Sequence, residues 1–104
     1  MKFHHVGIPT TEKKGEEVYL EDAKLYVTEI DDSPHKIEWL RFEEGSPMPK
    51  ELQEVAHVAY EVEDLKAALE GQEILIEPFS PMEGITVAFV LENGAPIEYM
   101  EVSK

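Results

Sequence analysis

The stretch from residue 55 to residue 65 reads Val55-Ala56-His57-Val58-Ala59-Tyr60-Glu61-Val62-Glu63-Asp64-Leu65, and Phe3-His4-His5-Val6-Gly7-Ile8 repeats its opening near the N-terminus. A second echo lies downstream, where Ile37-Glu38-Trp39-Leu40 follows the first histidine and Ile97-Glu98-Tyr99-Met100 follows the second. The His-to-Glu separations are 33 and 41 residues. The sequence therefore indicates one ancestral unit used twice. The repeat selects two histidines and two glutamates: His5, Glu38, His57 and Glu98.

Length and composition narrow the class of protein. With 104 residues and no cysteine, the chain has room for a single domain over residues 1–104 and excludes disulfides and thiolate metal sites. A chain of this size buries only about 60–65% of its unfolded surface, so packing against a second copy would help stability. We therefore expect a homodimer.

The chain is strongly acidic, with 23 Asp and Glu against 9 Lys and Arg and a formal net charge of −14. Such a charge repels phosphate backbones and anionic lipid, which disfavours nucleic acid and membrane surfaces as partners. The sequence has neither the basic and apolar segments of a signal peptide nor an apolar run long enough for a membrane span. We expect a soluble cytoplasmic protein with a small-molecule partner.

The first half, about residues 1–45, predicts mainly strands. Residues 2–8 alternate as a strand that ends at Pro9, with His5 and Gly7 on one face and His4 on the other. Residues 10–22 predict a loop and a short strand. Residues 23–30 and 36–43 predict a hairpin around the turn-rich segment 31–35.

A linker at about residues 45–53 contains two prolines and a glycine and leads to the second half, about residues 54–104. Here we predict a strand over 54–62 and a short helix between Asp64 as N-cap and Gly71. Three strands at about 73–77, 85–91 and 96–102 follow, separated by a loop over 78–84 and an Asn-Gly hairpin turn. The second half is thus βαβββ, and the first is the same unit with its helix shortened or lost.

These paired βαβββ units resemble the vicinal oxygen chelate superfamily, which includes glyoxalase I, methylmalonyl-CoA epimerase, extradiol dioxygenases and the fosfomycin and bleomycin resistance proteins. The resemblance covers nearly the whole chain and is most specific in residues 55–65 and 85–101. It implies an α+β fold in which the two modules form a curved mixed sheet around a metal cleft. By position, the metal ligands would be His5, Glu38, His57 and Glu98. The resemblance to glyoxalases also implies that Glu98 is the catalytic base, with Glu38 as its symmetry counterpart.

Two imidazoles and two carboxylates suit Zn²⁺, Ni²⁺, Mn²⁺ or Fe²⁺, and the ligand set alone does not choose among these ions. A metal bound by four protein ligands in an octahedron leaves two positions for substrate oxygens or water. Such an ion stabilises an enolate formed next to a carbonyl. This chemistry fits a metal-dependent lyase or isomerase.

Other residues compete for these roles. His4 would replace His5 as a ligand if the strand slipped by one residue, and Glu101 is the neighbour of Glu98 on the opposite face. His35 lies in a predicted turn, where solvent exposure is expected. Arg41, the only arginine, is a candidate for binding a substrate anion or for an ordinary surface role. Trp39 and Tyr99 follow the two glutamates and are expected to be core or interface aromatics.

Three classes of function fit these residues. The first is a metal-dependent lyase or isomerase, favoured because all four ligand positions are filled. The second is a ligand-sequestering protein like the bleomycin resistance proteins, and the third is a non-catalytic domain whose ligand set is vestigial. An extradiol dioxygenase is disfavoured because its iron uses two histidines and one carboxylate. Fold alone does not choose among them.

Overall fold

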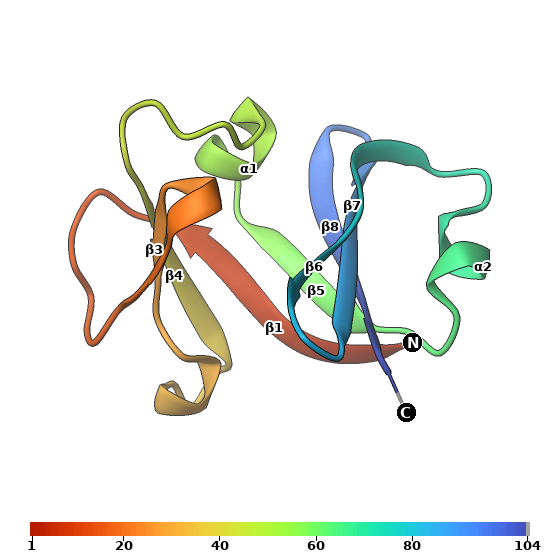
Figure 1. Ribbon diagram of the computed structural model, residues 1–104, viewed down its shortest axis with the longest axis horizontal. Helices are drawn as coiled ribbons and strands as arrows, with labels where there is room; N and C mark the ends of the chain where they lie inside the picture. Colours follow the sequence, from red (N-terminus) through yellow and green to blue (C-terminus); the bar gives the residue numbers. More distant parts are fainter. Residues whose placement is uncertain (104) are drawn as a thin grey trace.

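Eight strands form one mixed sheet in the computed structural model, which describes residues 1–103 (Figure 1). The strand order is β2-β3-β4-β1-β5-β8-β7-β6. The strands are β1 (Lys2–Pro9), β2 (Val18–Leu20), β3 (Leu25–Val27), β4 (Ile37–Phe42), β5 (His57–Glu61), β6 (Glu73–Met82), β7 (Ile85–Glu92) and β8 (Ala95–Val102). The helical segments are the α-helices α1 (Lys50–Glu54) and α2 (Leu65–Leu69) and the 3₁₀ turns η1 (Glu21–Ala23) and η2 (Ile30–Asp32).

The sheet carries the repeat that the sequence predicts. In the first half β1 pairs in parallel with β4, and in the second half β5 pairs in parallel with β8. The remaining strands of each half are joined as antiparallel neighbours. The two halves meet where β1 and β5 pair antiparallel, and both strands run across the molecule between the outer strands (Figure 1). The predicted curved, mixed sheet is therefore confirmed.

The first half lacks the helix of the second. Residues 10–17, between β1 and β2, contain no helix, as expected from the sequence. Side chains of this segment instead cover the strands: Lys14 Nζ lies 5.4 Å from the centre of the Trp39 ring, and Glu17 pairs with Arg41. The segment thus replaces an apolar helix face with polar contacts.

The structure differs from the sequence prediction at two places in the connections. Helix α1 begins at Lys50 inside the predicted linker, because the two prolines precede it and Leu52 finds a buried position. The predicted loop over residues 78–84 is wrong, because β6 continues to Met82 despite two prolines. Three register irregularities against β7 accommodate this segment, as expected for proline at a sheet edge.

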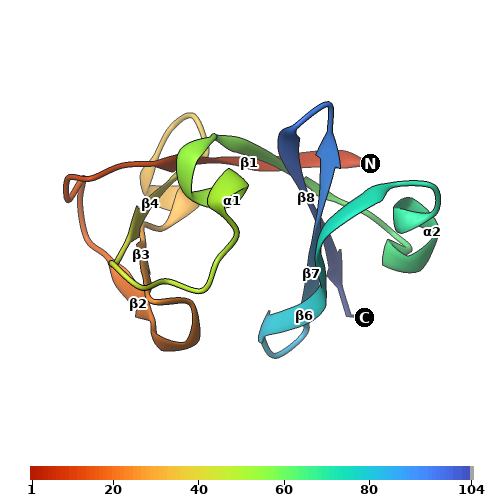
Figure 2. The same ribbon diagram turned by 90° about the horizontal axis from the view of Figure 1, so that it is seen from above.

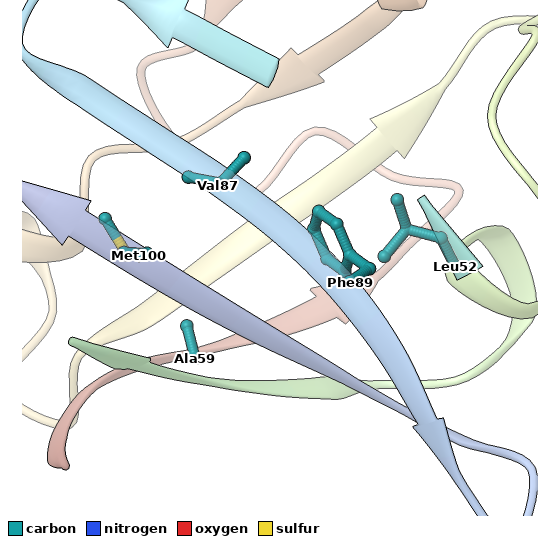
Figure 3. Packing of buried hydrophobic residues seen from close by; sticks show 5 residues of the cluster. All are labelled: Leu52, Ala59, Val87, Phe89 and Met100. Atoms are coloured by element: carbon teal, nitrogen blue, oxygen red, sulfur yellow. The ribbon is translucent and has the colours of Figure 1, made fainter. Parts of the chain in front are cut away.

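Two apolar clusters cover the two faces of the second half. On the inner face, which looks toward α1 and the other half, Ala59, Val87, Phe89 and Met100 pack with Leu52 of α1 (Figures 2 and 3). On the outer face, Leu65 of α2 packs with Val62, Ala88, Val90 and Tyr99. Strand β7 supplies both clusters, which explains its nearly continuous apolar sequence.

Within residues 1–103, no helix has the length and apolar character needed to cross a bilayer.

Candidate metal centre

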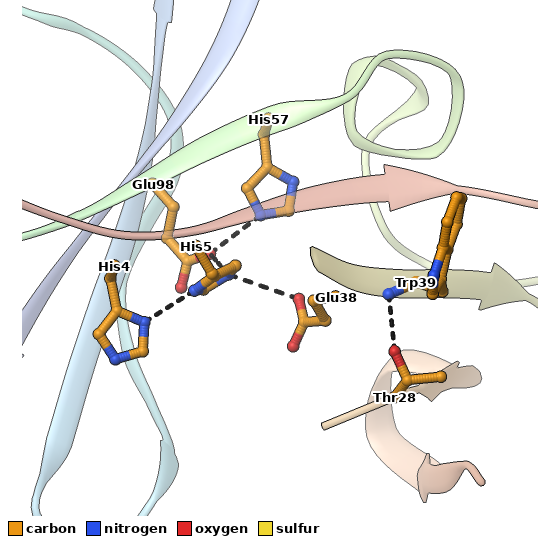
Figure 4. Close-up of polar contacts among 7 residues, drawn as sticks. All are labelled: His4, His5, Thr28, Glu38, Trp39, His57 and Glu98. Carbon is orange, nitrogen blue, oxygen red and sulfur yellow. Dashed lines mark hydrogen bonds and ion pairs between the residues drawn. The ribbon is translucent and has the colours of Figure 1, made fainter. Parts of the chain in front are cut away.

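The four central strands of the sheet each contribute one polar side chain to the inner face. His5 comes from β1, Glu38 from β4, His57 from β5 and Glu98 from β8. The pairing register places them together, because Gly7 of β1 lies opposite both Glu38 and His57. The next rung places Ala59 of β5 opposite both His5 and Glu98. Equivalent positions of the two repeats therefore meet at the centre of the sheet (Figure 4).

The four predicted residues lie close together, and Glu98 is the one outside the group of possible ligand atoms that the other three form. His5, Glu38 and His57 each offer a ligand atom within 4.8 Å of the other two. Nε2 of His5 lies 3.6 Å from Oε1 of Glu38 and 3.5 Å from Oε1 of Glu98. That same Glu98 oxygen lies 3.0 Å from Nε2 of His57. Glu98 thus contacts both imidazoles, whereas Glu38 contacts one.

Three of these side chains are buried, with exposed fractions of 4% for His5, 2% for His57 and 8% for Glu98. Nε2 of His5 and Nδ1 of His57 are buried without a hydrogen-bond partner. Buried polar atoms are normally satisfied, so an orphaned nitrogen that faces two carboxylates calls for a physical explanation. A bound cation would supply the missing partner of His5.

The charged groups of the site shift the pKa values of one another. Burial by itself lowers the pKa of His5, but the neighbouring Glu38 and Glu98 carboxylates outweigh it and raise that pKa to about 9. Burial by itself raises the pKa of Glu98, but the His5 and His57 imidazoles lower it to about 2. Without metal, His5 is therefore protonated and Glu98 ionised at neutral pH. A metal ion would take the place of the proton on His5.

Gly7 is a site residue that the sequence reasoning missed. A Cβ atom at this position would lie 2.2 Å from Cε1 and 2.7 Å from Nε2 of His57. The imidazole of His57, from the neighbouring strand, therefore occupies the space that a side chain at position 7 would fill. The available signal was the glycine itself inside an otherwise regular strand, which marks a close approach of another group.

The sequence predicts His4 on the face of β1 opposite His5, outward or packed, whereas the structure brings its half-buried ring against the ring of His5. The pairing of β1 with β5 shifts register between Phe3 and His5, so His4 is the extra residue of a β-bulge. The bulge interrupts the alternation and turns the His4 ring toward His5, with 2.8 Å between the two Nδ1 atoms (Figure 4). The same bulge separates Phe3 from the face of His5, and Phe3 is half exposed.

Strand β4, which carries Glu38, is anchored by hydrogen bonds between Trp39 and Thr28. The backbone N–H of Trp39 donates to Oγ1 of Thr28 at 2.9 Å (Figure 4), and the N–H of Thr28 donates to the carbonyl of Trp39 at 3.2 Å. These bonds extend the pairing of β3 with β4 beyond Val27 and anchor the backbone beside Glu38.

The other residues that the sequence offered for these roles lie outside the four-residue centre. Glu101 accepts a hydrogen bond from the backbone N–H of Leu65 at 2.7 Å and so supports the start of α2. His35 is exposed, as expected. Arg41 is held by Glu17 through two hydrogen bonds of 2.9 and 2.7 Å, which favours its structural interpretation. Tyr99 is a core residue under α2, as expected, and Trp39 is half buried.

Comparison with known proteins identifies the fold and no activity. No family model matches the sequence, and no curated protein matches it significantly. Among solved structures, the chain is similar to the hypothetical protein BH1468 from Bacillus halodurans C-125, with a TM-score of 0.70 and 23% sequence identity. The match covers 99% of this chain and 95% of that chain. The whole fold is therefore shared with a known structure.

Proposed function

We propose that His5, Glu38, His57 and Glu98 bind one divalent metal ion and that the protein is a metal-dependent lyase or isomerase acting next to a carbonyl of a small molecule. The observation that carries the proposal is the convergence of four ligand-type side chains from equivalent positions of both repeats. A metal ion would also give a partner to Nε2 of His5, which is buried without a hydrogen bond and lies 3.6 and 3.5 Å from the carboxylates of Glu38 and Glu98.

The residues fit a metal ion. Two ligands bonded to one ion at about 2.1 Å lie about 3 Å apart when adjacent and about 4.2 Å apart when opposite. The contacts of 3.0, 3.5 and 3.6 Å between the nitrogens and carboxylate oxygens fall in this range. The mixed nitrogen and oxygen donor set is compatible with Zn²⁺, Ni²⁺, Mn²⁺ or Fe²⁺.

When bound, the ion would act as a Lewis acid that polarises a substrate carbonyl and acidifies the adjacent C–H. A carboxylate of the chain must then remove the proton. Glu98 is buried and contacts both imidazoles. Glu38 has one contact at 3.6 Å and a side chain that is 24% exposed. These contacts favour Glu38 as the base, in place of the Glu98 that the resemblance to glyoxalases implies.

The charges around the site favour a neutral substrate or one whose only anionic oxygen binds the metal. The single arginine, which could have bound a distal carboxylate or phosphate, is occupied by the bidentate Glu17 carboxylate. Its ring partner is Tyr26, with the guanidinium carbon 4.2 Å from the ring centre. A net charge of −14 adds long-range repulsion of highly anionic substrates.

Elemental analysis tests the metal site. The protein is purified without a metal-affinity tag or chelator, together with a His57→Ala, Glu98→Ala double variant and a His35→Ala control. We expect near-stoichiometric metal in the wild type and the control and none in the double variant. Absence of metal in the wild type, and no uptake on titration, would refute the metal site and direct the search to ligand-sequestering functions.

Turnover distinguishes the catalytic proposal from metal binding alone. The metal-loaded protein is assayed with adducts of 2-oxoaldehydes and with acids that epimerise next to a carbonyl. If Glu38 is the base, Glu38→Gln lowers kcat by about 10²–10⁴-fold, the usual contribution of a general base. Metal content is measured for Glu38→Gln and Glu98→Gln as well, because Glu38 belongs to the group of ligand atoms within 4.8 Å, whereas Glu98 contacts that group through the two imidazoles. Metal binding without turnover on either substrate class would favour a binding protein.

A further inference from the structure

The bulge in β1 places a third imidazole behind the candidate ligands. His4 and His5 are adjacent in sequence, yet their Nδ1 atoms lie 2.8 Å apart and their rings meet edge to face at 76°. Bulges often occur beside active sites, where they redirect a side chain. His4, like Glu98, lies outside the group of ligand atoms that His5, Glu38 and His57 form.

The contact between the two rings links the tautomer of His5 to that of His4. One hydrogen lies between the two Nδ1 atoms, so one ring donates and the other accepts. Nε2 of His5 faces the carboxylates of Glu38 and Glu98. For this nitrogen to bind a metal it must carry a lone pair, and the hydrogen of the neutral ring must then be on Nδ1.

We infer that His4 is a positioning residue whose Nδ1 accepts a hydrogen bond from Nδ1–H of His5 and thereby keeps Nε2 of His5 available as the metal-binding nitrogen. This inference rests on the metal site proposed above. It gives His4 the role that carboxylates and backbone carbonyls commonly have behind metal-bound histidines, where they set the ring's tautomer and orientation.

Two substitutions of His4 distinguish the effect of its hydrogen-bond acceptor from the effect of its volume. His4→Asn places an amide oxygen near the position of Nδ1 and keeps an acceptor, whereas His4→Leu fills the space without one. The control is His35→Ala, which removes an exposed histidine. Zinc affinity is measured by competition with a chromophoric chelator. We expect a loss of about 10–100-fold for His4→Leu, the usual effect of removing such a partner, and less than about threefold for His4→Asn and the control.

Nitrogen NMR of the zinc-loaded wild type reads the tautomer directly and does not depend on any variant folding. We expect the bridging proton on Nδ1 of His5 and an unprotonated, metal-shifted Nε2. A bridging proton on Nδ1 of His4, or undiminished zinc affinity in His4→Leu, would overturn the inference while leaving the metal site intact. A wild type that binds no zinc would overturn both.

Discussion

At the scale of single residues, the site depends on the absence of a side chain at Gly7. Because a Cβ atom there would lie 2.2 Å from Cε1 of His57, Gly7→Ala must displace the imidazole or separate β1 from β5. We expect loss of metal binding and a decrease of about 1–3 kcal/mol in the free energy of unfolding, typical of overpacking. Metal titration and urea denaturation measure the two effects.

Gly15→Ala is the matched control for this substitution, because a Cβ at Gly15 has no atom within 4 Å. Its effect on stability should stay within about 0.5 kcal/mol. Full metal binding by Gly7→Ala would show that the His57 ring has room to move, and would contradict the close approach.

The ionic pairing of His5 with the carboxylates predicts a pH dependence for the metal-free protein. The pKa of His5 is raised to about 9, so its contribution to stability is complete below its unfolded value of about 6.5 and is lost as pH rises through 9. The pKa of Glu98 is lowered from 4.5 to about 2, so its contribution is present above 4.5 and is lost as pH falls toward 2. Both contributions are complete between about pH 4.5 and 6.5.

Urea denaturation in the presence of chelator, from pH 5 to pH 9.5, tests this dependence. The urea midpoint of the wild type should fall above pH 6.5, and that of His5→Asn should fall less, because asparagine has no proton to lose. The variant also controls for the general repulsion of an acidic chain at high pH. Parallel pH profiles of the two proteins would contradict the raised pKa of His5.

At the scale of elements, the short helix α1 attaches the segment that joins the two halves to the inner apolar cluster. Leu52 is its buried residue, with 4% of its surface exposed, and it packs with Phe89 and the rest of the inner cluster (Figure 3). Leu52→Ala should lower the free energy of unfolding by about 2–5 kcal/mol, through lost burial and the cavity that remains. Val55→Ala, at a side chain that is 42% exposed, is the control. A similar urea midpoint for both variants would indicate that α1 does not dock on the core.

At the scale of the whole molecule, the candidate metal would connect the two repeats, since β1 and β4 belong to one half and β5 and β8 to the other. Ligands that bind only the folded state stabilise it, by about 2.7 kcal/mol at a free concentration 100 times Kd. Removing metal with a chelator should therefore lower the urea midpoint of the wild type and leave that of the His57→Ala, Glu98→Ala variant unchanged. An equal response of both proteins would contradict binding at this site.

Assembly also belongs to this scale. The edge strands carry exposed apolar side chains, among them Tyr19 of β2, which is 42% exposed, and Met82 of β6, which is 61% exposed. Open edges and exposed apolar groups favour association. The homodimer stays a prediction, which sedimentation equilibrium measures.

The sequence by itself determined the repeat, most strands, the loss of the first helix and the four residues that meet at the centre. These follow from local rules: alternation assigns faces to a strand, and a repeated unit places equivalent residues symmetrically. The tertiary structure alone decided that His4 turns toward His5, that His57 lies over Gly7, that α1 forms and that β6 continues to Met82. Each of these depends on contact between strands or with the core, which a single segment does not encode. The proposal of Glu38 as base, in place of the Glu98 that the resemblance implies, rests on their unequal contacts, which the sequence does not show.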